Sequence, residues 1–582
     1  MVEASGQRRF GAGRQPATRV DPGRGLVVAL DFASASHLRA IALLIVCGAL
    51  FFLPGFFNIP PVDRDEARFA QATKQMVETS DYVDIRYQDE VRYKKPVGIY
   101  WLQAAAVETA SALGLPNAQV RIWLYRIPSL IGAIGAVLMT YWAALAFVSR
   151  RGAVLAALMM CSSILLGVEA RLAKTDAMLL LTTTAAMGAL ARIYLGWQRG
   201  DDPPRPGWTE PAIFWTAIAG GILLKGPLIL MLVLLCISAL VILDRSGGWL
   251  WRLRPLWGAM WTLALVLPWF IAILLRSGEN FFAESLGGDL LSKVASPQES
   301  HGAPPGYYFL LFWLTFWPGA VIAGLVIAPV WRARREPAAQ FLLAFVVPAW
   351  IVFELVITKL PHYVLPLYPA IAILIVGVVE QQVLTRKAWM MPGLSWWFFA
   401  PVVFAVLGIV GSIILIRQLE LVAWPFAAAA AIFGLIAWWM YDDRRAERSL
   451  LNAFAASFFI SLTIYGIVLP GLRPLFPSVE LARALRSVEC EKPRAAAAGY
   501  HEPSLVFMAG TSTLLTDASG AADFLAQGSC RFALIESRHE RQFAQRAERT
   551  GLRYAVVTRF EGYNFSQGRS IAMTIFRSEG TQ

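Results

Sequence analysis

Carboxylates and an arginine form a dense polar cluster early in this largely apolar sequence. Asp63, Asp65, Glu66 and Arg68 fall within one short segment. A carboxylate in such a cluster can orient a nucleophile or take its proton as a general base. The same acidic residues could also simply lie in a loop covered by water. In the first turn of a helix they would be favoured by the helix dipole. The cluster alone leaves a catalytic loop and a hydrated loop both open.

Two lysines follow in the same polar stretch. Lys94 and Lys95 directly precede Pro96, and Tyr100 and Trp101 come next. Ammonium groups beside aromatic rings suit a lipid phosphate, because the cations meet the phosphate while the rings lie at headgroup depth. Lysines that only extend from the membrane surface into water would give the same pattern. This second cluster indicates either a phosphate site or a membrane boundary.

Further polar residues recur at the ends of later apolar runs. They are Asp176, Lys225, His301, Lys359, His362 and Tyr363. Ionisable residues at membrane depth are functional candidates by default, although Asp176 would serve equally well as a helix cap. The 582 residues contain no HExxH, Walker, GxSxG or zinc-spaced cysteine motif, so ATP-driven chemistry and secreted-type hydrolysis find no support.

The composition is that of a membrane protein that crosses the bilayer many times. The chain is 57% hydrophobic and 16% charged, whereas soluble domains carry about 25% charged residues. The net charge of +12 comes from basic residues scattered over short loops. That distribution is typical of cytoplasmic loops and not of a nucleic-acid surface, so we expect no nucleic-acid partner.

Apolar runs long enough to span a bilayer divide the chain. We predict about thirteen spans, at 38–57, 122–148, 153–169, 176–196, 211–225, 227–243, 255–275, 306–330, 339–358, 362–384, 396–416, 422–440 and 450–470. The count depends on a break at Lys225-Gly226-Pro227. With that break and a cytoplasmic N-terminus, every cytoplasmic connection is basic, and the polar clusters fall on the outer connections.

The remaining segments complete the predicted organisation. We expect a disordered N-terminus over 1–37, a transmembrane catalytic domain over 38–472 and an outer α/β domain over 473–582. The outer loop at 58–121 should hold interfacial helices at 67–79 and 97–113. In the α/β domain, strands are predicted at 504–508, 531–536, 554–558 and 570–576, and helices at 521–527 and 540–550. Cys490 and Cys530 form a disulfide there or remain two free thiols.

These residues together resemble a known family. Asp65-Glu66-x-Arg68, followed by Lys95-Pro96 and Tyr100-Trp101, resembles the first outer loop of the GT-C glycosyltransferases, in particular the ArnT-like lipid A aminoarabinose transferases and the related protein O-mannosyltransferases. Later pieces come in the expected order: Ala170-Arg171 with Asp176, Lys225-Gly226, His301 with Pro304, and Lys359-Leu360-Pro361 with Tyr363. The resemblance covers roughly residues 38–470.

The resemblance implies a fold and an activity. The fold would be the helical GT-C fold with a small periplasmic α/β domain. The activity would be inverting transfer of a sugar from a polyprenyl-phosphate donor to lipid A or lipopolysaccharide, at the outer face of the bacterial inner membrane and among its lipids. The sugar and the acceptor are not identified by the sequence.

The resemblance also distributes roles among the candidate residues. Asp65 and Asp176 would be catalytic; Lys94, Lys95, Arg68, Lys225 and Tyr363 would bind the donor phosphate; Asp63, Glu66, His301, Lys359 and His362 would line the acceptor side of the pocket. ArnT-like enzymes have a glutamate where this chain has Lys94. Since a lysine is no metal ligand at neutral pH, a divalent cation at His301 is in doubt.

Two other functions fit parts of the pattern. A protein O-mannosyltransferase would perform the same transfer on Ser or Thr hydroxyls. A transporter or flippase would also have broken helices and intramembrane charges, but it would be supported by inverted repeats, and we find none in the sequence. A long acidic outer loop and a separate outer domain favour an enzyme.

Overall fold

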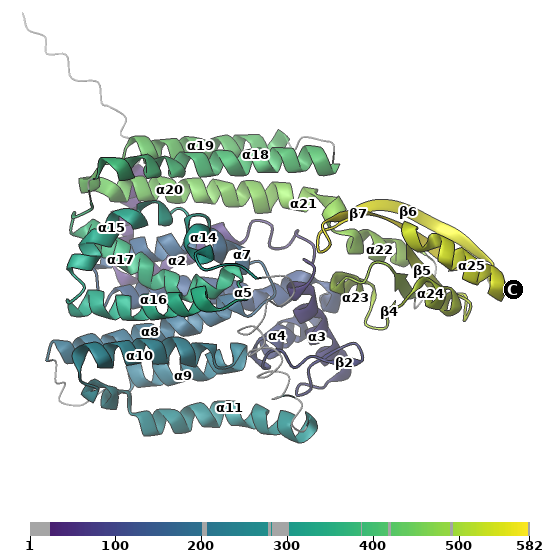
Figure 1. The fold of residues 1–582 in the computed structure, drawn as a ribbon, viewed down its shortest axis with the longest axis horizontal. Coiled ribbons are helices and arrows are strands. Elements are labelled where there is room, and N and C mark those ends of the chain that lie inside the picture. Colours follow the sequence, from purple (N-terminus) through teal and green to yellow (C-terminus); the bar gives the residue numbers. More distant parts are fainter. Residues whose placement is uncertain are drawn as a thin grey trace, which may run out of the picture.

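The computed structural model describes residues 24–200, 207–277, 281, 302–385, 387–416, 421–488, 490 and 493–579. In this part of the chain, long helices run side by side in a bundle, and an α/β domain lies at one end of it (Figure 1). Helices α3 and α4 lie at the same end, between the bundle and the domain (Figure 1). The polar loop of the sequence is thus enclosed from two sides.

The bundle is built from apolar helices. In chain order they are α1 (Arg24–Ser34), α2 (His37–Phe52), α5 (Ile122–Ala144), α6 (Arg150–Cys161), α7 (Ile164–Glu169), α8 (Asp176–Gln198), α9 (Thr209–Lys225), α10 (Leu228–Asp244), α11 (Pro255–Ser277), α14 (Tyr307–Thr315), α15 (Ala320–Arg332), α16 (Pro337–Leu355), α17 (Tyr368–Glu380), α18 (Trp396–Ile416), α19 (Trp424–Trp439), α20 (Ala446–Ser461) and the single turn α21 (Leu469–Gly471). Eight helical segments of the described chain are long and apolar enough to cross a membrane. The protein is therefore a multi-pass membrane protein, and the count of thirteen spans stays a prediction.

The predicted helix break at Lys225 is confirmed. Helix α9 ends at Lys225 and α10 begins at Leu228. Gly226 adopts φ 66° and ψ −140°, a conformation open to glycine and strained for other residues. Pro227 then supplies a fixed φ and no backbone donor. The break leaves the ammonium group of Lys225 at a helix end.

Two predicted spans are interrupted, and one prediction about the N-terminal segment was wrong. The span at 153–169 is divided into α6 and α7 at Ser162 and Ser163, and the span at 306–330 is divided into α14 and α15. The predicted disorder over 1–37 fails for Arg24–Ser34, which forms α1. Residues 1–23 lie outside the described part of the chain.

The loop between α2 and α5 contains two helices and a small hairpin. They are α3 (Asp65–Thr79), β1 (Arg86–Tyr87), β2 (Glu90–Val91) and α4 (Gly98–Ala112). Both predicted helices exist, but α3 does not lie on an open surface. Its polar residues Gln71 and Lys74 are buried, because the C-terminal domain covers them.

The C-terminal domain has a five-stranded mixed sheet in the order β4-β3-β5-β7-β6. The strands are β3 (Arg494–Ala498), β4 (Leu514–Leu515), β5 (Arg531–Glu536), β6 (Tyr554–Asn564) and β7 (Arg569–Ser578), and the helices are α22 (Pro477–Arg486), α23 (Pro503–Ala509), α24 (Ala518–Leu525) and α25 (Glu540–Thr550). Strands β3, β4 and β5 are parallel, and β7 is antiparallel to β5 and β6. Successive alanines of β3 pack into cores on opposite faces of the sheet.

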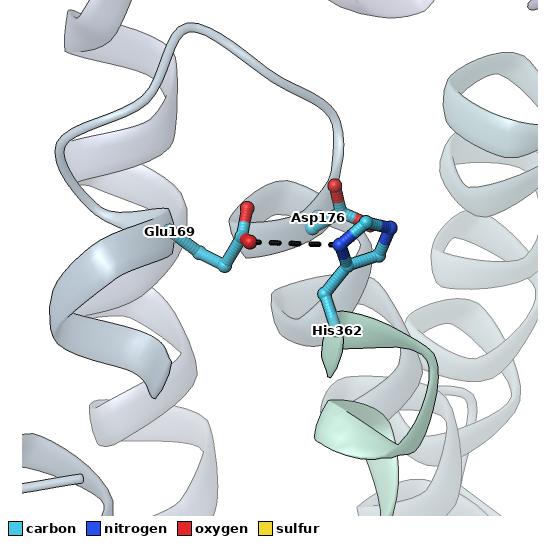
Figure 2. A group of neighbouring side chains, drawn as sticks. All are labelled: Glu169, Asp176 and His362. Carbon is cyan, nitrogen blue, oxygen red and sulfur yellow. Dashed lines mark ion pairs between the residues drawn. The ribbon is translucent and has the colours of Figure 1, made fainter. Parts of the chain in front are cut away.

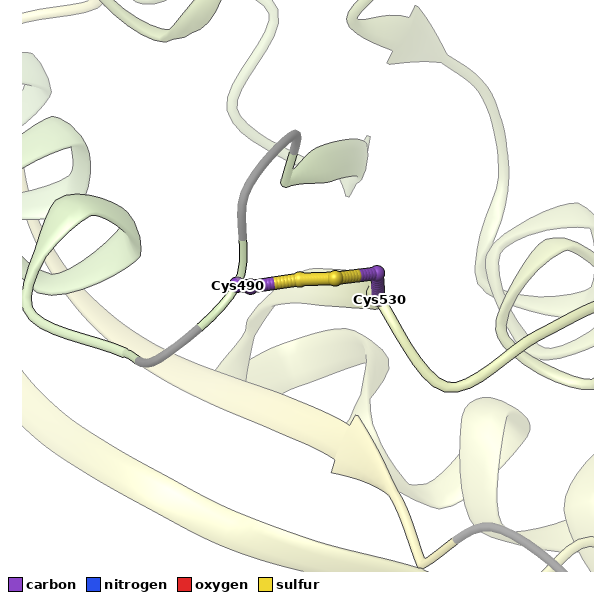
Figure 3. Close-up of a disulfide and its surroundings, with 2 residues drawn as sticks. All are labelled: Cys490 and Cys530. Carbon is purple, nitrogen blue, oxygen red and sulfur yellow. A yellow bond between two sulfur atoms is a disulfide. The ribbon is translucent and has the colours of Figure 1, made fainter.

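All but one of the predicted elements of this domain are confirmed, and several elements were not predicted. The strand predicted at 504–508 is the helix α23, and the strands β3 and β4 and the helix α22 were missed. A disulfide joins Cys490 to Cys530, with the two Cα atoms 5.9 Å apart (Figure 3). This bond settles the alternative that the sequence left open, and it ties the segment before β3 to the segment before β5.

Candidate functional site

A histidine lies between two buried carboxylates where three bundle segments meet. His362 Nδ1 is 3.7 Å from Glu169 Oε1, and His362 Nε2 is 3.6 Å from Asp176 Oδ1 (Figure 2). Glu169 ends the short helix α7, Asp176 begins α8, and His362 belongs to the 3-10 segment Pro361–Leu367. The three side chains are 3%, 6% and 9% exposed. Their charges must be balanced locally, since an isolated buried charge costs several kcal/mol.

Two lysines supply that balance. Lys225, at the helix break, pairs with Asp176 Oδ1. Lys174 Nζ lies 3.2 Å from Glu169 Oε1 and 3.7 Å from Asp176 Oδ2. The set of Glu169, Lys174, Asp176, Lys225 and His362, which we call the buried charge network, therefore holds two carboxylates against two ammonium groups.

Two further predicted residues lie around the network. Lys225 Nζ is 5.5 Å from the centre of the Tyr363 ring, within the range of a cation–π contact. Lys359 is 4% exposed, and its ammonium group donates to the carbonyl of Val356 at 2.5 Å. Lys359 thus holds its own chain segment, whereas Tyr363 extends the network.

The first turn of α3 is fixed beside this network by a buried ion pair. Arg126, fully buried within α5, donates Nε to Glu66 Oε1 at 2.7 Å and Nη2 to Glu66 Oε2 at 2.9 Å. Glu66 also accepts the backbone N–H of Val62 at 2.8 Å and that of Ala173 at 2.9 Å. The pair joins the start of α3 to the segment that carries Lys174. Glu66 is 2% exposed, so the structure places it inside this joint and not on a pocket wall.

Asp65, one residue before, is exposed at the N-terminus of α3. Arg64 in front of it has φ 68° and ψ −112°, a costly conformation for a residue with a side chain. Burial opposes the charged form of Lys174, but the carboxylates of Glu169, Asp176 and Asp65 outweigh it and raise the pKa of Lys174 above its ordinary value. Asp65 is therefore within electrostatic range of the network.

A close contact joins the start of α4 to the end of α9. A Cβ added at Gly98 would lie 2.7 Å from the carbonyl oxygen of Leu223, so the start of α4 touches the end of α9. Lys95 lies three residues before Gly98 in the sequence, outside α4, and Lys225 lies two residues after Leu223. Lys95 is half-buried and donates to the carbonyl of Lys94 at 3.0 Å, while Lys94 is exposed.

The other predicted residues are placed elsewhere. Arg68 is half-buried on α3. Asp63 contacts the C-terminal domain, where it accepts the backbone N–H of Ser504 at 3.1 Å and the hydroxyl of Tyr500 at 3.5 Å. His301 lies outside the described residues.

Glu169, Asp176 and His362 have ligand atoms within 4.8 Å of one another, as a metal site would. The charge balance does not fit a bound cation, because Lys174 and Lys225 already neutralise both carboxylates. A divalent ion would leave the buried network with two excess positive charges. We therefore derive no step through a metal.

Three important residues were missing from the predicted site. Glu169 and Lys174 precede Asp176 by seven and two residues and were not among the predicted site residues, and Arg126 fell within the predicted span at 122–148. A signal for Arg126 was present, since a charged residue within such a span marks a functional or structural pair. Its partner Glu66 is sixty positions away, and sequence alone does not pair them.

Comparisons with known proteins agree with this architecture. Residues 62–278 match the model of the family described as dolichyl-phosphate-mannose-protein mannosyltransferase. The chain is 30% identical over 340 residues to the undecaprenyl phosphate-alpha-4-amino-4-deoxy-L-arabinose arabinosyl transferase of Aeromonas salmonicida, a match that covers 56% of this chain and 58% of that protein. The protein of the same name from Edwardsiella ictaluri is 27% identical, with 59% of each chain covered. This chain thus spans a little over half the length of these relatives.

A solved structure extends the likeness to most of the chain. The crystal structure of ArnT from Cupriavidus metallidurans bound to undecaprenyl phosphate superposes with a TM-score of 0.69 at 18% identity, over 93% of this chain and 98% of that one. At this identity the match establishes the fold. Residues 62–278 are therefore similar to the dolichyl-phosphate-mannose-protein mannosyltransferase family model, within a chain that has the fold of the ArnT structure.

Proposed function

We propose that the protein is an integral-membrane glycosyltransferase that moves a sugar from a polyprenyl-phosphate donor to an acceptor at the outer face of the bacterial inner membrane. The observation that carries the proposal is the buried charge network beside the Asp65 end of α3. It offers cations for a phosphate and carboxylates for an acceptor in one place. The N-terminus would be cytoplasmic and the C-terminal domain periplasmic.

The donor phosphate is assigned to the lysines. Breaking the bond between the sugar C1 and the phosphate oxygen places negative charge on the leaving phosphate, and fixed cations stabilise that charge as it forms. Lys225 and Lys95 are the principal candidates, since the contact between Gly98 and Leu223 brings their segments together. Lys94, Arg68 and Tyr363 would complete this side of the pocket.

Lys174 gives the network a reserve cation. When Lys225 turns toward a phosphate, Asp176 loses its ion-pair partner. Lys174 Nζ is 3.7 Å from Asp176 Oδ2, so a positive charge remains beside Asp176. When Lys225 moves to the donor, Lys174 would then be shared between Glu169 and Asp176.

The acceptor side is assigned to Asp65 and Asp176. Asp65 is exposed, within range of the network, and on a helix held in place by Glu66 and Arg126. It would orient the acceptor, and take a proton if the nucleophile is a hydroxyl. A single displacement inverts the configuration at C1. Asp63 and Glu66, first assigned to this pocket, have structural roles in the proposal.

The comparisons support an undecaprenyl-phosphate donor, because the curated relatives are named for such a donor and the solved ArnT structure holds undecaprenyl phosphate. Lipid A or lipopolysaccharide is the first candidate acceptor. The test is a reaction of the purified protein in liposomes with lipid A and an undecaprenyl-phosphate sugar, followed by mass spectrometry. A mass increase of one sugar residue is expected. Lipid A of unchanged mass with every donor tried contradicts the lipid acceptor.

A second acceptor class is favoured by the family match over residues 62–278. Protein O-mannosyltransferases perform the same displacement on Ser or Thr hydroxyls, where Asp65 would have to act as a base. Adding an acceptor peptide to the same reaction separates the two. Modified peptide beside unmodified lipid A would replace the lipid acceptor with a protein acceptor.

A further inference from the structure

The C-terminal domain makes hydrogen bonds to α3 along its length. Lys74 donates to the carbonyl of Phe507 at 3.1 Å, and Gln71 Nε2 donates to Thr511 Oγ1 at 2.9 Å. The hydroxyl of Thr511 in turn donates to Glu78 Oε2 at 2.6 Å. Lys74 is 4% exposed and Gln71 is fully buried. These are directional contacts that bury Gln71 and Lys74, where a buried group without a partner would be costly.

Hydrogen bonds from the domain also reach both ends of the helix. Beyond the C-terminal end, Gln88 Nε2 donates to the carbonyls of Thr511 and Thr513 at 3.0 and 2.6 Å. Before the N-terminal end, Arg64 Nη2 donates to the carbonyl of Ser566 at 2.7 Å. Ser566 belongs to the turn of the β6–β7 hairpin. The domain therefore fixes the position of α3 at three separate places.

One of the contacts adjoins the candidate catalytic carboxylate. Asp63 accepts the backbone N–H of Ser504 and the hydroxyl of Tyr500, and it precedes Asp65 by two residues. Glu502, 7% exposed, belongs to the C-terminal domain and stands between Tyr500 and Ser504 in the sequence. A second carboxylate near Asp63 makes the contact sensitive to the protonation of Asp63.

We propose that the C-terminal domain is a positioning element for α3 and thereby for Asp65, and that Asp63 makes its docking stronger in mild acid. The positioning role is tested by sugar transfer and therefore rests on the proposed function. The effect of Asp63 is tested by docking of the domain on α3 alone. Thr511 and Asp63 are positioning residues, because they touch the domain interface and not the reacting atoms.

The direction of the pH effect follows from the surroundings of Asp63. Burial raises the pKa of Asp63 to about 6, the carboxylate of Glu502 adds to the rise, and the hydrogen bonds from Ser504 and Tyr500 oppose it. Tyr87, Arg68 and Arg92 are also within electrostatic range of this region. Since the docked pKa is higher than that of a solvated aspartate, docking is favoured below pH 6 and weakens as the pH rises through 6.

Hydrogen exchange on the full-length protein in detergent or nanodiscs measures docking without any substrate. The observable is the protection of the α3 amides, corrected for the intrinsic pH dependence of exchange. Wild type should show higher protection at pH 5.0 than at pH 7.5, and Asp63→Asn should lose this difference. Equal protection of wild type at the two pH values, or an unchanged difference in Asp63→Asn, overturns the role of Asp63.

Positioning is tested by a matched pair of threonine variants. Thr511→Val removes a hydroxyl from the interface, whereas Thr550→Val removes one from α25, where it bonds only its own helix. Thr511→Val should speed α3 exchange by about thirtyfold, the worth of the two hydrogen bonds that its hydroxyl makes with Gln71 and Glu78. It should lower kcat for transfer while the Kd for undecaprenyl phosphate stays the same. Thr550→Val should change none of these.

The outcomes separate this inference from the proposed function. Faster α3 exchange with an unchanged kcat overturns the positioning role. Unchanged α3 exchange in Thr511→Val overturns the claim that contacts with the C-terminal domain hold α3 in place. Absence of transfer by wild type refutes the proposed function, and the exchange results then decide the docking half on their own.

Discussion

Lys225 has two roles in the proposed site, neutralising Asp176 and binding the donor phosphate. It neutralises Asp176 in a buried site, and it ends the helix α9, whose residue Leu223 contacts Gly98 at the start of α4. A residue used only for charge balance would not need the helix break that places it there. The break, the ion pair and the nearby Tyr363 ring together favour a cation that exchanges partners when a phosphate arrives.

Replacing this lysine should therefore affect the donor first. Lys225→Met keeps most of the side-chain volume and removes the charge. We expect the Kd for undecaprenyl phosphate to rise by at least about tenfold, a loss of about 1.4 kcal/mol of phosphate interaction. Lipid-binding titration in detergent measures it. Lys387→Met serves as the control, since Lys387 is an exposed lysine of another connection, and equal affinities for Lys225→Met and wild type would remove Lys225 from the donor site.

Arg126 carries a different kind of importance. Its guanidinium is fully buried and holds both oxygens of Glu66. Arg126→Met leaves Glu66 charged, buried and without its counterion, which costs about 3–5 kcal/mol. A marked fall in the unfolding midpoint in detergent should result, while Arg546→Met, which breaks an exposed pair with Asp523, should leave the midpoint nearly unchanged. Similar midpoints for both variants would contradict the buried-pair account.

At the scale of elements, the contact of α4 with α9 sets the spacing of the donor lysines. Gly98→Ala places a Cβ against the Leu223 carbonyl, 2.7 Å away, so one helix must shift. We expect weaker binding of undecaprenyl phosphate because Lys95 and Lys225 move apart. At Gly377 an added Cβ meets only Val148, at 3.7 Å, and Gly377→Ala is the matched control. Equal loss of donor affinity in both variants would point to a general folding defect.

The apolar elements could be predicted from the sequence because their signals are local. The break at Lys225 followed from glycine, proline and loop charge. The wrong strand at 504–508 arose because Ser-Leu-Val-Phe-Met is apolar in the way of a buried strand, yet it is a helix that covers α3. Strand β3 was missed because four alanines give no strand signal. Their small size is what lets the sheet and its covering helices approach closely.

The candidate site was predictable only in part. Asp176, Lys225, His362 and Tyr363 are brought together as expected, since each lies at the end of an apolar run. The pairing of Glu66 with Arg126 and the burial of Gln71 and Lys74 depend on contacts between distant segments. These residues can be read in the sequence, but the distant residues that they contact cannot be identified from it.

At the scale of the whole molecule, the C-terminal domain and the bundle meet over α3. The disulfide between Cys490 and Cys530 lies within the domain and closes a loop with a sequence separation of 40. Loop closure of this length is worth about 4 kcal/mol in the unfolded chain. The double variant Cys490→Ser with Cys530→Ser should lower the unfolding midpoint of the domain. Protease protection of residues 477–579 measures this, and an unchanged digestion rate would deny the bond a stabilising role.

The arrangement also explains why α3 is both polar and buried. Its first turn is tied to the bundle by Glu66 and Arg126, and its outer face is tied to the domain by Gln71 and Lys74. Asp65 is left exposed at the end of a helix that is held from two directions. Such a placement gives a carboxylate a fixed position with an open side, which a base or an orienting group requires.

The most direct test of the account is the behaviour of Asp65→Asn in liposomes that contain lipid A and an undecaprenyl-phosphate sugar. The amide is nearly isosteric, so binding of undecaprenyl phosphate should match wild type while sugar transfer, followed by the mass of lipid A, falls by at least about a hundredfold. Transfer at the wild-type rate by Asp65→Asn would contradict the catalytic role of Asp65 and the reading of the site that depends on it.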